Sequence, residues 1–258
     1  MGISVLSVIV YIIAGLGAGI GTGLAGLSAA AVISPMLITF LGFPAYQAVG
    51  IALASDVLAS AVSAYTYGKH KNLDIKNGLI MLFTVLIFTL VGSYVASLLP
   101  NSTMGGFSVV ITFVLGIKFI VRPVMTTKEN LAVKSAKTKA VQSVLCGIAV
   151  GFICGFIGAG GGMMMLLLLT SVLGYELKTA VGTSVFIMTF TAFTGAASHM
   201  AIGGFPDPFA LVMCIIATFV GARGSALFAN KASPATLNRI TGVVLAVLGA
   251  AMMAVKFL

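Results

Sequence analysis

Apolar stretches of about 20 residues recur along almost the whole chain, separated by short connections. A helix needs about 20 mostly apolar residues to cross the hydrocarbon core of a bilayer. Hydrophobic residues make up 60% of the chain and charged residues only 7%, and the mean hydropathy is +1.19. The sequence therefore predicts an all-α polytopic membrane protein with no separate soluble domain. The N-terminal stretch lacks the basic region of a signal peptide, so we expect it to form the first membrane helix.

The chain carries a formal net charge of +9. Its Lys and Arg residues gather in the connections between apolar stretches, which is typical of cytoplasmic loops under the positive-inside rule. We therefore expect no nucleic-acid partner. The three cysteines lie inside apolar stretches without metal-ligand spacing, so we expect neither a disulfide nor a metal or cofactor.

Residues in the first half recur in the second half at an offset of 132 positions. Examples are Gly15 with Gly147, Gly19 with Gly151, Gly23 with Gly155, Gly26 with Gly158, and Ala48-Val49-Gly50 with Ala180-Val181-Gly182. A constant offset across unrelated residue types indicates duplication. We divide the chain into a first transmembrane repeat (1–121), a basic linker (122–139) and a second transmembrane repeat (140–258).

Each repeat is expected to contain a glycine-rich double segment followed by three helices. The predicted double segments are 3–41 and 140–173, and the predicted helices are 45–68, 77–99 and 103–121, and then 178–201, 208–228 and 236–257.

The charge distribution favours inverted repeats. If segment 3–41 returns to its starting side, the basic loops 69–76 and 122–139 share one side with Lys178 and Lys231. If that segment crosses the bilayer once, the two lysines move to the outside, which fits the positive-inside rule poorly. We therefore expect a cytoplasmic-membrane protein with both termini outside and the linker in the cytoplasm.

The glycines of the double segments fall into two groups with different expected roles. Gly147, Gly151 and Gly155 are four residues apart, the spacing by which small residues let two helices approach closely. The cluster that follows is too rich in glycine for a helix interior, where each glycine costs about 1 kcal/mol. We expect a break there, with a half-helix that points its electropositive N-terminus at an anion. The residues concerned are Gly158, Gly160, Gly161 and Gly162, with Gly26 and Ser28 at the milder break of the first repeat.

A second pair of segments also carries polar groups, at Gly50–Asp56 and at Gly182–Met188. Thr183 and Ser184 either donate to an oxyanion or bond back to their own helix. Asp56 lies inside an apolar helix, where a carboxyl group marks either a functional position or one paired with its neighbours. Near an anion, the role consistent with its charge is that of a proton carrier.

Two further polar residues lie near helix ends. His199 is either a group that titrates during transport or an interfacial histidine bonded to a carbonyl. Arg223 either reaches the membrane surface or pairs with substrate or Asp56. Taken together, the predicted substrate-binding residues are Gly26, Ser28, Gly50, Ser55, Gly158, Gly160, Gly161, Gly162, Gly182, Thr183 and Ser184, and the predicted proton-coupling residues are Asp56 and His199.

In these features the chain resembles the sulfite exporter TauE/SafE family of membrane anion transporters. The likeness lies in the glycine-rich opening of each half, in the Ala-Val-Gly and Ala-Val-Gly-Thr-Ser segments, in the basic loop before Asp74, and in the Gly-Ala-x-Gly-Ser-Ala pattern at 221–226. The resemblance implies transport of a small sulfur-containing or organic anion such as sulfite, thiosulfate or sulfoacetate, coupled to the proton gradient. The chain departs from a symmetric pattern at Ile51-Ala52, opposite Thr183-Ser184, and at Asp56.

The leading hypothesis is a secondary transporter that rocks one repeat against the other around a site at the middle of the membrane. The alternatives are a permease or channel for another small solute, and an intramembrane hydrolase built from Ser184 or Ser198 with His199. Adjacent helix residues project about 100° apart, so Ser198 and His199 cannot pair, and we expect no enzyme.

Overall fold

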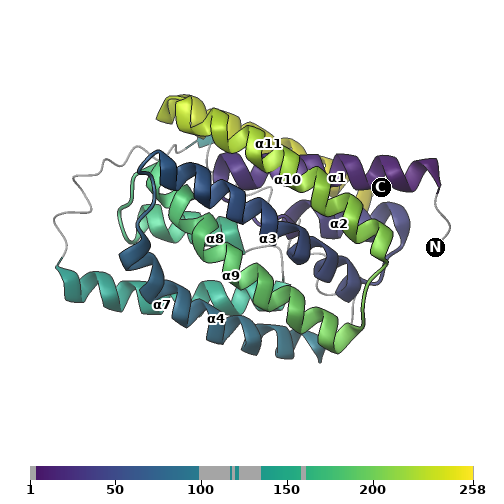
Figure 1. Cartoon of the computed structure of the whole chain (residues 1–258), viewed down its shortest axis with the longest axis horizontal. Helices are drawn as coiled ribbons and strands as arrows, with labels where there is room; N and C mark the ends of the chain where they lie inside the picture. Colours follow the sequence, from purple (N-terminus) through teal and green to yellow (C-terminus); the bar gives the residue numbers. More distant parts are fainter. Residues whose placement is uncertain (1–3, 99–116, 118–119, 122–134, 158–160, 258) are drawn as a thin grey trace.

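The structure, a computed structural model, describes residues 4–98, 117, 120–121, 135–157 and 161–257. All of the regular structure within these residues is helical (Figure 1). The helices are α1 (Val5–Ala25), α2 (Ala30–Leu41), α3 (Ala45–Lys69), α4 (Ile75–Ser97), α7 (Ala136–Ile157), α8 (Gly161–Ser171), α9 (Leu177–Gly203), α10 (Pro208–Lys231) and α11 (Pro234–Phe257).

The all-α prediction is confirmed, and the predicted helices match α3, α4, α9, α10 and α11 to within a few residues at each end. Most of the predicted helix 103–121, and most of the linker, lie outside the described residues. Helix α7 begins at Ala136, four residues before the predicted start of the second repeat.

Within the described part of the chain, five helices are long and apolar enough to cross a membrane, namely α1, α3, α4, α9 and α10. Helices α2 and α8 have only 12 and 11 residues. At 1.5 Å per residue they extend about 16 to 18 Å, roughly half of the hydrocarbon thickness. Large apolar side chains such as Ile13, Phe83 and Val220 are exposed on the outer faces of the long helices, as expected for surfaces that contact lipid.

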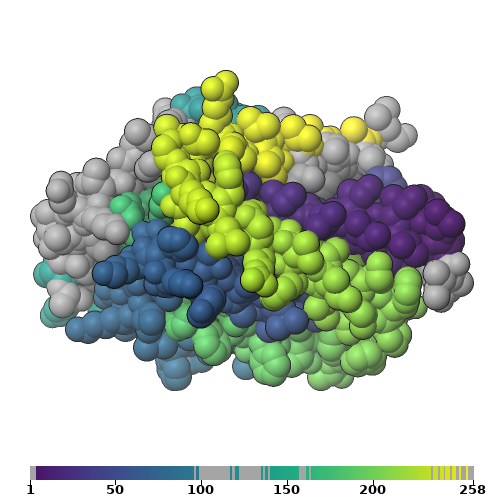
Figure 2. Space-filling model, turned by 45° about the horizontal axis from the view of Figure 1, so that its top comes forward, coloured from purple at the N-terminus to yellow at the C-terminus, as the bar shows by residue number. Residues whose placement is uncertain are grey.

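Two pairs of long helices run parallel in close contact, α1 with α10 and α4 with α7. Gly15, Gly19 and Gly23 approach successively later residues of α10, and Gly147, Gly151 and Gly155 approach successively later residues of α4. A Cβ on Gly19 would collide with the carbonyl of Thr218 and lie 2.7 Å from the Ala222 nitrogen. These glycines therefore serve as helix-packing positions. Figure 2 shows α1 lying beside α10 and α11 on one outer face.

Helices α3 and α9 run antiparallel between the two parallel pairs (Figure 1). Tyr46 near the start of α3 stacks on His199 near the end of α9, with ring centroids 4.3 Å apart. At the other end of the pair, Tyr67 of α3 packs against Gly182 of α9, where a Cβ would lie 2.9 Å from the Tyr67 Cβ. The two equivalent helices of the repeats thus form the centre of the molecule.

The first double segment folds back on itself. Gly17 of α1 faces Val32 of α2, and the ring of Tyr11 lies 6.5 Å from that of Phe43, which follows α2. The chain therefore runs away from Tyr11 along α1 and returns through α2 to the same end of the molecule. Of the two paths considered for segment 3–41, the structure has the one that returns.

The packing corrects one detail of the repeat. Gly23 faces the Ala222 oxygen and Ala226 nitrogen, whereas Gly155 faces the Thr89 oxygen and Ser93 nitrogen. These contacts match at an offset of 133, not 132. The same offset relates Asp74 and Asp207, which accept hydrogen bonds from the backbone nitrogens at the starts of α4 and α10. A slip of one residue in the correspondence of the two halves therefore precedes α4 and α10, and the offset of 132 holds only up to that point.

Candidate substrate site

The break in the first double segment lies at Gly26, which has φ +63° and ends α1 in the left-handed conformation. Glycine adopts this conformation without the steric cost that a Cβ imposes. The Gly26 nitrogen donates to the Thr22 oxygen at 2.8 Å, and the Thr22 hydroxyl lies 2.8 Å from the carbonyl oxygen of Leu27, to which it donates. Buried backbone groups that the break frees are in this way partly satisfied by the end of α1.

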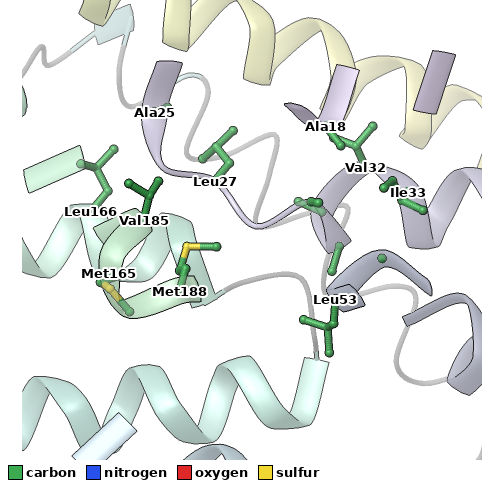
Figure 3. Close-up of a cluster of buried hydrophobic side chains, with 14 of the residues drawn as sticks. Ala18, Ala25, Leu27, Val32, Ile33, Leu53, Met165, Leu166, Val185 and Met188 are labelled. Atoms are coloured by element: carbon green, nitrogen blue, oxygen red, sulfur yellow. The ribbon is translucent and has the colours of Figure 1, made fainter. Parts of the chain in front are cut away.

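Helix α2 restarts directly after the break. The Ser28 hydroxyl accepts from the Ala30 nitrogen at 3.3 Å, and the Ser28 carbonyl accepts from the Ala31 nitrogen at 3.0 Å. Ser28 is buried, so the N-terminus of α2 lies inside the protein and not at its surface. Figure 3 shows the chain turning between Ala25 and Val32, with Met188 on the neighbouring helix.

The breaks of the two repeats meet at Gly162, the second residue of α8. A Cβ on Gly162 would lie 2.6 Å from the Gly26 oxygen, 2.6 Å from the Ser28 nitrogen and 2.7 Å from the Met188 sulfur. Gly161 is packed in the same way against Cys154 of α7. The predicted site residues Gly158 and Gly160 lie outside the described residues. The N-terminus of α8 thus touches the segment that precedes α2.

Ser184 joins the two breaks to α9. Its hydroxyl donates to the Gly26 oxygen at 3.3 Å, so it bonds to the broken segment of the other repeat. Thr183 faces elsewhere, because its hydroxyl accepts from the Asp74 nitrogen at 3.1 Å, next to α4. Of the two neighbouring hydroxyls that the sequence singles out, only Ser184 lies at the breaks.

Asp56 lies halfway along α3 and is fully buried. The Ser60 hydroxyl donates to its Oδ1 at 2.9 Å. Its polar neighbours from other elements are the Thr22 and Ser28 side chains and the Ala29 N–H, and the Cys154 thiol of α7 also faces it. Its interacting neighbours among the described residues include no Lys, Arg or His. An intramembrane carboxyl therefore sits against the break of the first repeat without a cationic partner among the described residues.

The second repeat places a different residue at the equivalent position. Asp56 corresponds to Met188, which contacts Gly162, and Thr22 corresponds to Cys154. The third helix of each repeat therefore presents one side chain to the N-terminus of its own half-helix. In the first repeat this side chain is a carboxyl, and in the second it is an uncharged thioether.

Several residues predicted for the site lie away from the breaks. The Ser55 hydroxyl donates to the Ile51 oxygen of its own helix at 2.8 Å. Gly50 faces the Cβ of His199, and Gly182 provides room for Tyr67. His199 is bonded through Nδ1 to the Gly195 oxygen and stacks on Tyr46 at the end of α9.

Arg223 is exposed on the outer face of α10 and is not among the groups that interact with Asp56. Ser184 and His199 are 15 residues apart on one helix, or about 22 Å, so they do not form a nucleophile and base. No group of three or more metal-binding side chains comes together within the described part of the chain.

A polar cluster joins the two repeats at the end of the molecule where α3 ends. The Tyr175 hydroxyl donates to Asp74 Oδ2 at 2.9 Å, and the Asn72 amide donates to Asn230 Oδ1 at 2.9 Å. Lys178 donates to the Asn230 carbonyl at 2.9 Å. Burial raises the pKa of the Tyr175 hydroxyl, and the Asp74 carboxylate beside it raises that pKa further, so Tyr175 remains a donor at neutral pH.

Sequence reasoning did not single out Thr22, Ser60, Cys154 or Met188 as site residues. Two signals could have identified them. Ser60 follows Asp56 by four residues, which places it on the same helix face. Thr22 and Cys154 occupy equivalent positions. Each lies four residues before a glycine at a predicted break, Gly26 and Gly158 respectively.

The chain is similar to known membrane proteins over nearly its whole length. The family described as sulfite exporter TauE/SafE matches residues 11–252. The chain is 28% identical to the probable membrane transporter protein YunE of Bacillus subtilis, over 95% of this chain and 96% of that protein. It is 27% identical to a probable membrane transporter protein of Methanocaldococcus jannaschii, over 94% of each. No solved structure gives a significant match. The match of the family over nearly the whole length, together with the apolar helices, shows that the chain belongs to the TauE/SafE family of multi-pass membrane transporters.

Proposed function

We propose that the protein is a secondary transporter that carries a small sulfur-containing or organic oxyanion across the cytoplasmic membrane by proton-coupled alternating access. The observation that carries this proposal is the contact between the two interrupted segments, where Gly162 of α8 packs on Gly26 and Ser28. Non-helical backbone at membrane depth is tolerated where protein or a watery cavity receives it. Broken half-helices of this kind build the solute sites of many secondary transporters.

The anion is expected at the N-terminus of α8. Helix N-termini attract anions through their unpaired N–H groups and the helix dipole. At the N-terminus of α2, the Asp56 carboxyl and the Ser28 hydroxyl already occupy this position. At the N-terminus of α8 the equivalent side chain is Met188, which brings no charge of its own. Gly161 and Gly162 bring no side chains of their own, and the side chains packed against them are those of Cys154 and Met188.

Asp56 couples this site to protons. Two unit charges about 4 Å apart interact by about 4 kcal/mol at an effective dielectric constant of 20, so an ionised Asp56 would oppose a bound anion. The carboxyl is fully buried and its interacting neighbours include no cation among the described residues. We therefore assign Asp56 as the proton carrier that is neutral when the anion is bound. One proton then accompanies each anion.

Two observations support inverted repeats. The equivalent helices α3 and α9 run antiparallel, so the two-fold axis that relates them is perpendicular to them and lies in the membrane plane. Hydrogen bonds from Asn72 and Lys178 to Asn230 bring the basic loop 69–76 to the same end as Lys178 and Lys231. This end is the cytoplasmic one under the positive-inside rule. The two halves then rock around the breaks to expose the site alternately.

The direct test is flux in proteoliposomes that contain the purified protein. Sulfite, thiosulfate, sulfate, a sulfonate and a carboxylate are each offered with and without a pH gradient. We expect saturable flux of at least one of the sulfur oxyanions, accelerated when the side that supplies the anion is acidic. Flux that grows linearly with concentration would indicate a channel, and the absence of flux for every oxyanion would contradict the assigned function.

A further inference from the structure

A row of hydroxyl groups extends from Asp56 along one face of α3. Its members are Ser60, Ser63 and Tyr67, at positions 4, 7 and 11 after Asp56. At 100° per residue these positions fall within an arc of about 60°. The side chains of Asp56 and of the three row members are all fully buried inside the protein. A continuous polar row in the buried face of an apolar membrane helix is costly unless it has a role.

The row has free hydrogen-bonding capacity. Ser60 donates to Asp56 Oδ1 at 2.9 Å, and Tyr67 donates to the Gly23 oxygen at 3.0 Å. Among the described residues, Ser63 Oγ and Asp56 Oδ2 have no hydrogen-bond partner. Buried polar groups are nearly always bonded to protein or to ordered water. Side chains three or four positions apart on a helix lie about 5 to 6 Å apart, a separation that one water can bridge.

The second repeat lacks this row. The equivalent positions on α9 carry Met188, Ala192, Gly195 and His199, none of which has a hydroxyl group. Because α3 and α9 are antiparallel, the equivalent face of α9 runs from the breaks toward the end of the molecule opposite to the one that the row on α3 reaches. Hydroxyl groups therefore connect Asp56 with one end alone, the end that carries the Asn72 and Asp74 cluster.

We propose that Asp56 exchanges its proton along Ser60, Ser63 and Tyr67 with the side of the membrane on which loop 69–76 lies, and with the opposite side only through the anion site when that site is open there. This inference rests on the proposed transport function. In each transfer a hydroxyl or water accepts a proton on one side and passes its own proton on. The net result is one proton moved, Asp56 ionised or protonated, and every hydroxyl restored. The groups that face Asp56 from other helices are Thr22, Ser28, the Ala29 N–H and the Cys154 thiol, and none of them belongs to the row.

The test compares Ser63→Ala with Thr66→Val in proteoliposomes. Thr66 is a buried hydroxyl on the same helix that donates to the Val62 oxygen and lies off the row, so its loss controls for removing a hydroxyl from α3. Two rates are measured, namely net anion uptake driven by a pH gradient, and anion exchange at equal pH, which needs no net proton transfer.

Ser63→Ala is expected to slow pH-driven uptake and the accompanying internal acidification about tenfold, while exchange is retained. Ser63→Thr is expected to restore uptake, and Thr66→Val to leave both rates unchanged. A Ser63→Ala protein with normal pH-driven uptake would overturn the proton path and leave the transport function intact. If Ser63→Ala does not fold, Ser60→Ala is measured in the same way, and normal uptake there is equally contradictory. Wild-type protein without any exchange would instead refute the transport function.

Discussion

Gly162 and Asp56 are the residues on which the proposed substrate site depends most. Gly162 is the point where one broken segment touches the other, and its contacts with Gly26 and Ser28 are backbone atoms that cannot rotate away. Asp56 is the buried carboxyl beside the same contact. Neighbouring positions have different roles, because a step of one residue along a helix turns a side chain by about 100°. Ser184 faces Gly26 while Thr183 faces Asp74 for this reason.

Gly162→Ala is expected to weaken oxyanion binding at least about tenfold, because the added methyl group collides with Gly26 and Ser28 and forces the two breaks apart. Gly224→Ala is the matched control. Gly224 is exposed on α10, and a methyl group added there would have no other atom within 4 Å. Binding is measured by calorimetry on purified protein. Equal affinities in the two variants would mean that the breaks do not form the anion site.

At the scale of the helices, the parallel pairs α1 with α10 and α4 with α7 hold one repeat against the other. Their glycines are predictable from sequence, since spacing by four marks one face of a helix. The bounds of the long helices are predictable too, because apolar length and the flanking charges determine them. The slip of one residue in the correspondence of the two halves, before α4 and α10, cannot be predicted in this way. It arises in loops where the sequences of the two halves no longer match.

The site was predictable in part for the same reasons. A glycine cluster and a lone carboxyl both stand out in an apolar chain, and the structure brings Gly26, Ser28, Gly162, Ser184 and Asp56 together. Hydroxyl groups do not stand out in this way. Ser55 and Ser60 are both plausible partners until the structure shows that Ser60 bonds Asp56 and Ser55 bonds its own helix.

Substitutions at two glycines of α1 distinguish the effect of helix packing on stability from the effect of helix propensity. Gly19→Ala is expected to destabilise the protein by about 1 to 3 kcal/mol, because its methyl group collides with the α10 backbone. Gly17→Ala is expected to be neutral or to stabilise by up to about 1 kcal/mol, because its nearest contact is a Val32 methyl at 3.7 Å. Thermal unfolding in detergent compares the two. A Gly19→Ala protein as stable as Gly17→Ala would show that α1 and α10 are not packed this closely.

At the scale of the whole molecule, the two halves have the same helices but different chemistry along their central pair. The first half carries a carboxyl and a row of hydroxyls, whereas the equivalent positions of the second carry the Met188 thioether, two small residues and His199. If the halves are inverted, this difference makes the two sides of the membrane unequal. A structurally symmetric frame then exchanges protons with Asp56 differently on its two sides, while the gradients of anion and protons set the direction of transport.

Inversion has a direct consequence for equivalent positions. Lys76 and Phe209 correspond at an offset of 133, and both are exposed at the starts of their helices. Cysteines introduced as Lys76→Cys and Phe209→Cys are expected to react with a membrane-impermeant thiol reagent from opposite sides of the membrane, with Phe209→Cys labelled in intact cells. The three native cysteines are buried and provide a low background. Labelling of both positions from the same side would require parallel repeats.

The most direct measurement of the central claim is the number of protons taken up when an anion binds. Calorimetry in buffers of different ionisation enthalpy gives this number, with a sulfonate as the ligand because its own charge does not change near neutral pH. At a pH high enough that Asp56 is ionised in the unliganded protein, we expect about one proton per anion in the wild type, so that affinity there rises about tenfold for each unit by which the pH falls. Asp56→Asn is expected to bind without proton uptake and with the same affinity at every pH. Wild-type binding without proton uptake, or uptake that persists in Asp56→Asn, would contradict an anion site whose charge is balanced by Asp56.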